Sequence, residues 1–181
     1  DFKHTIAVLN ELSQTGQYEK LQEYIAKYSS EISNVQAPAT YCDNPVVNAT
    51  IHYYIDIARS YDIRTKLQVV IPKETAISDI DLCLIFGNLL DNAITACRKA
   101  KAGSRFIRLS ADLDTPGFLY VTMVNSFSGE VYKRNGKYIS TKEKKSGIGL
   151  TSIQATTEKY QGSSNFYTEN HEFISNIMLK L

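Results

Sequence analysis

The amino-acid sequence predicts an α+β fold, in which helices pack on one face of a mixed, mostly antiparallel sheet. The first observation is that apolar residues recur at spacings of three and four in several windows, as on one face of a helix. The second is the stretch 105–113, where apolar and polar residues alternate strictly, as in a half-buried strand. The third is the turn Pro116-Gly117, after which an apolar run at 118–125 can return as the partner strand.

Residues 1–34 predict a hairpin of two short amphipathic helices, joined by a turn at Thr15-Gly16-Gln17. The apolar stripes consist of Phe2, Ile6 and Leu9 in the first helix and of Leu21, Tyr24, Ile25 and Tyr28 in the second. Two such helices cannot bury both stripes by themselves. Pairing with a second copy would form a four-helix bundle, and packing on the rest of the same chain is the alternative.

Residues 35–43 predict a linker, and residues 44–181 predict the main domain. This domain begins with a helix that Asn44-Pro45 opens, because proline is favoured at the first helical position. A second helix follows Ser78, which with Asp81 three residues later resembles a capping box. The expected strands of the domain are 66–71, 105–113, 118–125, 164–167 and 172–179.

The composition is typical of a soluble globular protein, with 43% hydrophobic and 22% charged residues among 181. A net charge of +1 gives no strong attraction to nucleic acid or to an anionic membrane surface. The three cysteines lack the spacing of a metal site, so we expect Cys42, Cys83 and Cys97 to be reduced and buried. No membrane span or signal peptide is expected, and a start at Asp1 within a helical pattern suggests a fragment.

Two asparagines four residues apart, Asn88 and Asn92, lie within the second helix of the main domain. Both lie beside its apolar face, which consists of Leu82, Ile85, Leu89, Ala93 and Ala96. Asparagine forms helices poorly, because its side chain competes for backbone hydrogen bonds, so the pair needs a reason. Either the two amides are solvated or locally bonded, or they face a polyphosphate ligand whose magnesium ion takes a hard amide oxygen.

A glycine pair, Gly147 and Gly149, precedes a further helical pattern that ends at Gly162. Glycines at the start of a helix let the backbone approach an anion, which the free N–H groups and the helix dipole can then hold. Gly-x-Gly alone is weak, since most such pairs are turns. Asn-x-x-x-Asn-Ala on one helix, followed by a basic loop and Gly-x-Gly-Leu, is a far more specific combination.

These two motifs, in this order, resemble the nucleotide-binding domain of the superfamily of gyrase, Hsp90, histidine kinases and MutL (GHKL). Residues 87–96 resemble its N box, and residues 147–150 resemble its second glycine box. The chain is most similar to the quorum-sensing, peptide-pheromone branch of sensor histidine kinases. This similarity rests on Asn-Leu-Leu-Asp-Asn-Ala-Ile, Val124-Asn125-Ser126, Ser140-Thr141-Lys142 and Asp1-Phe2-Lys3-His4. It covers essentially the whole chain and implies a Bergerat-type ATP-binding α/β sandwich after the helical hairpin.

The resemblance implies a role for each residue that matches these motifs. Asn92 corresponds to the amide that binds Mg²⁺, and Asn88 to the catalytic and nucleotide-binding position one turn before it. Asn125, at the end of its strand, would accept a hydrogen bond from the adenine amino group through its side-chain carbonyl. Contacts with phosphate are expected from the basic lid, which spans 127–145, and from the glycine box, at Lys142, Gly147, Gly149 and Leu150.

Asn88 also bears on the kind of reaction. In the ATP-hydrolysing branches of the superfamily this position is a glutamate, which can act as a general base on water. An amide cannot accept a proton at neutral pH. The sequence therefore favours transfer of the phosphoryl group to a better nucleophile than water, and disfavours rapid hydrolysis.

His4 is one of two candidates for the phosphoacceptor. Asp1 lies at helical spacing from His4 and could take its proton. The family pattern, however, places the acceptor immediately before the aspartate, and therefore before Asp1. We expect that preceding histidine to be the acceptor, so that this fragment binds ATP without phosphorylating itself. His52 and His171 are expected to be structural or solvated.

The resemblance thus implies the cytoplasmic kinase core of a two-component sensor that uses ATP and Mg²⁺. Such a core forms a homodimer through its helical hairpin and passes phosphate from a histidine to a response regulator. The alternative is an ATP-binding regulatory module without autokinase activity, whereas Asn88 argues against an ATPase of the gyrase or chaperone type. The parent protein is expected to be anchored in the bacterial cell membrane through an upstream sensor region.

Overall fold

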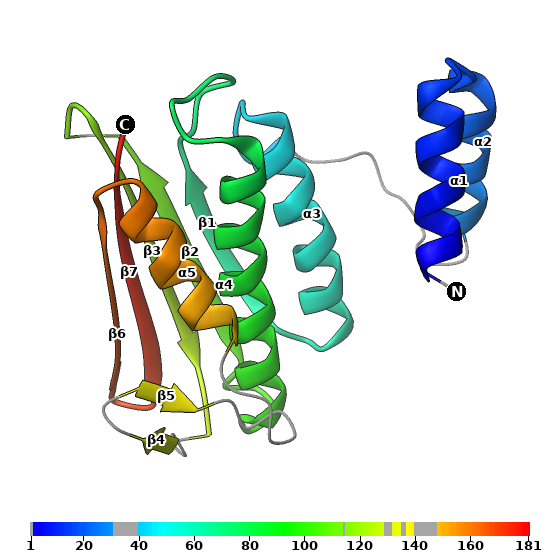
Figure 1. Ribbon diagram of the computed structural model, residues 1–181. Helices are drawn as coiled ribbons and strands as arrows, with labels where there is room; N and C mark the ends of the chain where they lie inside the picture. The colour runs from blue at the N-terminus through cyan, green and yellow to red at the C-terminus, as the bar shows by residue number, and fades with distance from the viewer. Residues whose placement is uncertain (1, 31–39, 114, 129–131, 135–136, 140–147) are drawn as a thin grey trace. The chain divides into compact units, whose positions relative to one another are not determined.

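The structure is a computed structural model that describes residues 2–30, 40–113, 115–128, 132–134, 137–139 and 148–181. Of residues 2–7, 27–30, 132–134, 137–139 and 148 it describes the backbone alone. The chain divides into two compact units, Asp1–Pro38 and Ala39–Leu181. Figure 1 shows the helices and strands of both units.

The first unit contains two helices, α1 (Phe2–Gln14) and α2 (Tyr18–Ser30). Gly16 lies in the turn between them with a φ of 69°, a left-handed conformation that glycine adopts without strain. Its N–H donates to the Ser13 carbonyl at 3.2 Å, and the Gln17 N–H donates to the Leu12 carbonyl at 3.0 Å, so the turn satisfies the end of α1.

The second unit is a sheet covered on one face by three helices (Figure 1). Its helices are α3 (Pro45–Ser60), α4 (Asp79–Lys99) and α5 (Ile148–Lys159). Its main strands are β1 (Arg64–Val69), β2 (Phe106–Asp112), β3 (Phe118–Ser126), β6 (Ser163–Glu169) and β7 (Glu172–Lys180), in the order β1-β2-β3-β7-β6. Only β1 and β2 are parallel, so the predicted mixed, mostly antiparallel sheet is confirmed.

The helix α3 begins where the sequence predicts. The Asn44 side-chain oxygen accepts hydrogen bonds from the backbone N–H groups of Val46 and Val47, and Pro45 occupies the first helical position. The buried side of α3 consists of Val47, Ile51, Ile55 and Ala58. The strand after it begins two residues earlier than predicted, at Arg64, and ends at Val69 rather than at Ile71.

The buried apolar face of the central helix α4 is wider than the sequence predicts. The predicted positions Leu82, Ile85, Leu89 and Ala93 are buried, whereas Ala96 is only half-buried. Phe86, Leu90, Ile94 and Cys97 are buried as well, because the sheet covers one side of α4 while α3 and α5 cover its flanks. By length and composition α4 could cross a membrane, but this burial identifies it as the core helix of the domain.

The strands β2 and β3 show the alternation that the sequence predicts. Ile107, Leu109 and Ala111 on β2 are buried beneath the helices, opposite Asn125, Met123 and Val121 on β3. After α5, the chain enters β6 at Gly162, where a Cβ atom would overlap the carbonyl oxygen of Met178. Because glycine has no Cβ atom, only glycine at position 162 allows the backbone after α5 to lie this close to β7.

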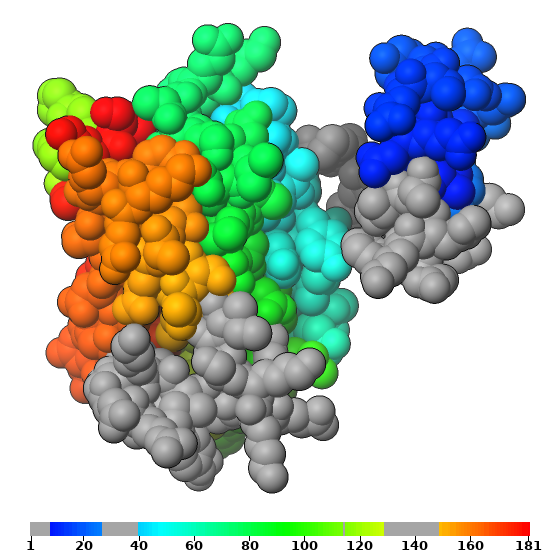
Figure 2. Space-filling model, viewed as in Figure 1, coloured from blue at the N-terminus to red at the C-terminus, as the bar shows by residue number. Residues whose placement is uncertain are grey.

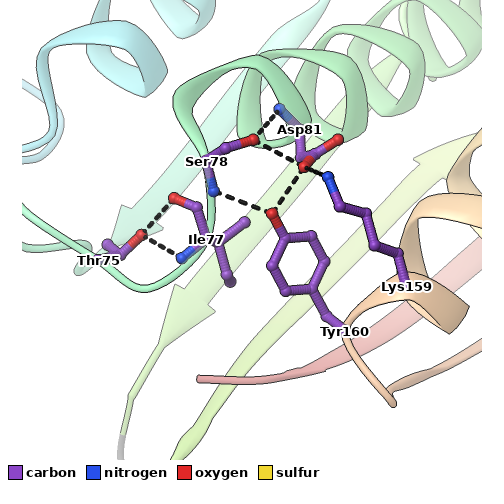
Figure 3. A network of polar contacts seen from close by, with 6 residues as sticks. All are labelled: Thr75, Ile77, Ser78, Asp81, Lys159 and Tyr160. Carbon is purple, nitrogen blue, oxygen red and sulfur yellow. Dashed lines mark hydrogen bonds and ion pairs between the residues drawn. The ribbon is translucent and has the colours of Figure 1, made fainter.

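The C-terminal end of α5 is tied to the N-terminal end of α4 (Figure 3). The Asp81 carboxylate accepts hydrogen bonds from the Tyr160 hydroxyl and Lys159 Nζ at 2.6 Å each, and from the Ser78 hydroxyl at 2.7 Å. The predicted capping box is therefore only half formed. Ser78 Oγ accepts from the Asp81 N–H, but the Ser78 N–H donates to Tyr160 Oη, because the Asp81 carboxylate binds α5 instead.

The cysteine prediction is partly wrong. Cys42 and Cys97 are free and buried, whereas Cys83 is free but exposed, because it lies on the side of α4 that faces away from the sheet. The Cys83 sulfur is 3.6 Å from the hydroxyl of Thr50 on α3. Burial raises the pKa of both Cys42 and Cys97 above the usual thiol value, so these two thiols stay protonated and unreactive.

Candidate functional site

The two asparagines of the predicted N box lie one turn apart in the middle of α4, where both are half-buried. Asn88 Nδ2 donates to the backbone carbonyl of Leu84 at 2.8 Å, which fixes the orientation of this amide against its own helix. The side chain of Asn92 is held differently, since its Nδ2 atom is buried and has no hydrogen-bond partner among the described residues.

Gly149 brings the second motif directly onto the first. It lies in the first turn of α5, and a Cβ atom built on it would be 3.0 Å from Asn88 Oδ1 and 3.2 Å from Asn92 Nδ2. These distances are too short for an ordinary side-chain contact, so the absence of a side chain lets the α5 backbone approach both amides. Two sequence motifs that are more than fifty residues apart therefore form one site.

The buried amide of Asn92 fits the ligand that the sequence predicts. A buried N–H donor without a partner costs free energy on the order of 1–3 kcal/mol, and a hydrogen-bond acceptor on a ligand, such as a phosphate oxygen, can remove this cost. An amide oxygen is a hard ligand suited to Mg²⁺, and backbone N–H groups at a helix start suit phosphate. The residues at the junction of α4 and α5 are thus of the kinds that could hold a magnesium–nucleotide complex.

Asn125 lies near the end of β3, opposite Ile107 of β2 and Phe173 of β7. Because residues directly opposite in an antiparallel pair share a face, Asn125 lies on the same face as Ile107, which the helices cover. It is 2% exposed, and its Nδ2 atom donates to the backbone carbonyl of Ser126 at 3.0 Å. This bond orients the amide.

Of the remaining predicted site residues, some are described with their side chains and others are not. Leu150 is half-buried and packs against the hydrophobic core. His4 lies in α1, but its side chain is outside the described part of the chain, as are Lys142 and Gly147 entirely. Within the predicted lid, two short antiparallel strands are described, β4 (Tyr132–Arg134) and β5 (Lys137–Ile139).

The other two histidines lie on α3 and in the hairpin between β6 and β7. His52 is in α3, its ring lies 4.8 Å from the ring of Tyr41, and its Nε2 atom is buried without a partner among the described residues. His171 and Asn170 form the turn between β6 and β7, with φ values of 62° and 48°. Asparagine and histidine adopt this left-handed conformation more often than most residues do. His171 is thus part of a hairpin turn.

Sequence reasoning missed two residues behind Asn125. Ser126 lies in a motif that carries the resemblance, but the sequence predicts no role for it, and it predicts only burial for Cys97. In the structure the Cys97 sulfur lies 3.4 Å from Ser126 Oγ, and both residues are buried. No spacing rule could have identified them, because β3 and the end of α4 meet only in the folded domain.

Comparison with known proteins gives a consistent result. The family model described as the GHKL domain matches residues 77–180. This range contains α4, β3 and α5, the elements that carry the asparagines and Gly149. The catalytic domain of the histidine kinase ThkA superposes with a TM-score of 0.58 at 13% identity, covering 76% of this chain and 92% of that one. The mycobacterial sensor histidine kinase MprB gives 0.56 at 18% identity, with 75% and 93% covered.

One sequence relative is the sensor protein TdiS of Thauera aromatica. It is 23% identical over an alignment of 165 residues, and the alignment covers 87% of this chain. The chain spans only 29% of the length of TdiS. The two solved structures share the fold of this chain over about three quarters of its length.

Proposed function

The chain belongs to the GHKL domain family, and on that premise we propose that it is the ATP-binding catalytic core of a two-component sensor histidine kinase. In this proposal it transfers the γ-phosphoryl group of ATP to a histidine, from which the group passes to a response regulator. The membership in the GHKL superfamily that the sequence predicted is confirmed. The peptide-pheromone branch stays a prediction.

The observation that carries this proposal is the contact of Gly149 with both Asn88 and Asn92. Where a glycine box packs against the asparagines of an N box, two kinds of ligand group lie close together. The asparagines supply amide oxygens for a metal ion, and the helix start supplies backbone N–H groups for phosphate. The ATP complex would bring Mg²⁺, which neutralises phosphate charge during phosphoryl transfer. Asn92 would hold the metal ion, while Asn88 and Gly149 would line the phosphate.

The choice of transfer over hydrolysis rests on the amide at position 88. Asn88 donates to the Leu84 carbonyl through Nδ2, and an amide oxygen cannot take a proton from water. Since no general base is supplied at this position, the site holds ATP for a separate nucleophile. An imidazole on a helical hairpin would serve that purpose.

Further parts of the proposal concern the longer protein. We propose that residues 1–34 contribute to a homodimer interface, that a response regulator receives the phosphate, and that the core acts in the cytoplasm. The parent protein is proposed to be membrane-anchored. The presence of a much longer sensor protein among the relatives supports this arrangement.

The proposal is tested by nucleotide binding together with incorporation of radioactive γ-phosphate from Mg²⁺-ATP. We expect the chain to bind Mg²⁺-ADP, and Asn92→Ala to weaken binding by about tenfold or more, because a ligand of a charged group is lost. Asn165→Ala, an exposed asparagine on β6, is the matched control and should bind normally. Absence of nucleotide binding by the unmodified chain would overturn the proposal.

The phosphate label distinguishes the two candidate acceptors. Label on this chain that is lost in His4→Ala would identify His4. Label that appears only on a protein extended upstream of Asp1 would identify a preceding histidine. Nucleotide binding without label on either protein would instead favour the regulatory module.

A further inference from the structure

Resting on the proposed nucleotide site, we propose that Ser126 and Cys97 lock the side-chain amide of Asn125 in one orientation, and that this lock makes the site select adenine over 6-oxopurines. The two residues act through Asn125, so they are positioning residues.

The lock is a small buried network that joins α4, β2 and β3. Ser126 Oγ accepts a hydrogen bond from the backbone N–H of Phe106 at 3.1 Å and lies 3.4 Å from Cys97 Sγ. The Cys97 thiol in turn donates to the backbone carbonyl of Phe106 at 3.2 Å. The side chains of Ser126 and Cys97 therefore take up both backbone polar groups of Phe106, and the end of β3 is fixed to the end of α4.

This network reaches Asn125 through one carbonyl group. The backbone oxygen of Ser126 accepts from Asn125 Nδ2 at 3.0 Å, and Cys97 Sγ lies 3.4 Å from the same oxygen. Asn125, Ser126 and Cys97 are 2%, 6% and 0% exposed, so water cannot easily replace these contacts. Burial keeps the pKa of the Cys97 thiol raised, so the thiol keeps the proton that it donates.

An amide has two unlike ends, and this gives the lock a consequence. With Nδ2 bound to the Ser126 carbonyl, the acceptor Oδ1 is the end left for a ligand, and it suits the 6-amino group of adenine. A flipped amide would place Oδ1 against the Ser126 carbonyl, acceptor against acceptor. It would also present a donor, which suits the 6-oxo group of hypoxanthine or guanine. Selectivity therefore depends on holding the amide still.

The position of Asn125 fits a base-binding role. Cys97 contacts the residue after Asn125 and lies five residues beyond Asn92 on α4, a rise of about 8 Å along the helix axis. Asn125 also lies on the helix-covered face of the sheet. The base contact and the phosphate contacts would thus be made along the same half of α4.

The test compares the affinities of Mg²⁺-ADP and Mg²⁺-IDP by titration calorimetry on the full 181-residue chain, since IDP differs from ADP in carrying a 6-oxo group. We expect the chain to prefer ADP by about tenfold or more, the ratio expected for a site built around one hydrogen bond. Ser126→Ala and Cys97→Ala should each lower this preference by about threefold or more, because the amide is released. Cys97→Ser, which keeps a donor, should restore most of it.

Two controls separate the lock from a general loss of structure. Ser163→Ala, an exposed serine on β6, should leave the preference unchanged. In an Asn125→Asp background, Ser126→Ala should no longer change the preference, because a carboxylate has two like ends and no donor.

Three results would count against the lock. An equal loss of affinity for both nucleotides in Ser126→Ala would overturn it, as would a lowered preference that persists in the Asn125→Asp background. A chain that binds ADP and IDP equally would overturn it while leaving nucleotide binding intact. Binding of neither nucleotide would overturn the proposed function itself.

Discussion

Asn88 and Asn92 are held in different ways, although they lie one turn apart on the same helix. Asn88 is fixed by its bond to the Leu84 carbonyl, whereas the buried Nδ2 of Asn92 has no partner among the residues that the structure describes. Gly149 lies against both. At the residue scale, the site therefore combines one rigid amide, one amide without a partner for its nitrogen, and one position where a Cβ atom would crowd both amides.

Gly149→Ala is expected to weaken Mg²⁺-ADP binding by about tenfold, with little change in the folded state. The new methyl group would be 3.0 Å from Asn88 Oδ1 and 3.2 Å from Asn92 Nδ2, so the amides must shift or α5 must withdraw. Calorimetric titration with Mg²⁺-ADP measures the effect, and the far-ultraviolet circular dichroism spectrum checks the fold.

Gly87→Ala is the matched control for this substitution. Gly87 is also helical and lies next to Asn88, but its Cβ atom would meet only the Tyr54 side chain at 3.7 Å, an ordinary contact. Alanine is a better helix former than glycine by about 1 kcal/mol, so stability should not fall. Equal effects of the two substitutions on binding would contradict the role given to Gly149.

At the scale of elements, α5 is attached to α4 at both of its ends. Gly149 meets the two asparagines at the N-terminal end, and Lys159 with Tyr160 meets Asp81 at the other end (Figure 3). Figure 2 shows α5 and α4 as adjacent surfaces on the helical face of the sheet. Because α5 is anchored far from the asparagines, the position of its first turn depends on a contact outside the site.

Asp81→Asn is expected to destabilise the domain at neutral pH. Hydrogen bonds from Lys159, Tyr160 and Ser78 lower the pKa of Asp81 from 3.8 to about 2. A carboxyl whose pKa is lower in the folded state contributes stability above its unfolded pKa and loses it as the pH falls through the folded value. The stability difference between wild type and variant should therefore be largest above about pH 4, shrink as the pH falls, and vanish only below about pH 2.

Urea unfolding of both proteins across this pH range measures that difference. Asp56→Asn is the control, because Asp56 pairs with Arg59 at 3.0 Å but the two side chains are 55% and 60% exposed. Exposed pairs of this kind contribute about 1 kcal/mol or less, so the control should unfold nearly as the wild type does. A stability gap for Asp81→Asn that does not change with pH would refute the ionic origin.

At the scale of the whole molecule, the chain is two separate units. The hydrophobic core of the second unit includes buried residues from Cys42 in the segment before α3 to Leu179 on β7. Among residues whose side chains are described, it includes none from α1 or α2. In the described part of the first unit, Tyr18 is 64% exposed, and Ile25 of the predicted apolar stripe remains 48% exposed, so this stripe is incompletely covered.

A shortened chain, Ala39–Leu181, is expected to fold and to bind Mg²⁺-ADP within about threefold of the full chain, because the core and both motifs lie within it. Its urea midpoint should match the main transition of the full chain. Circular dichroism and calorimetry measure these two quantities. Loss of the cooperative transition would show that the second unit needs the first.

Much of the fold could be predicted from local patterns. The cap at Asn44, the alternation in β2 and the helix around the asparagines depend on residues close in the sequence, and the structure has each of them. The membership in the superfamily was predictable because two motifs occur in one order. The exposed Cys83 was missed, because helical periodicity does not tell which side of α4 faces a neighbouring helix and which faces solvent.

The amino-acid sequence by itself determined the α+β class, the helix that carries Asn88 and Asn92, and the kind of ligand that such amides suit. Only the tertiary structure decided that Gly149 lies on those amides, that Asp81 binds α5 instead of completing its own cap, and that Ser126 and Cys97 meet behind Asn125. The physical reason is that hydrogen-bonding partners of a polar side chain are chosen by proximity in space. Segments distant in sequence become neighbours only when the helices pack on the sheet.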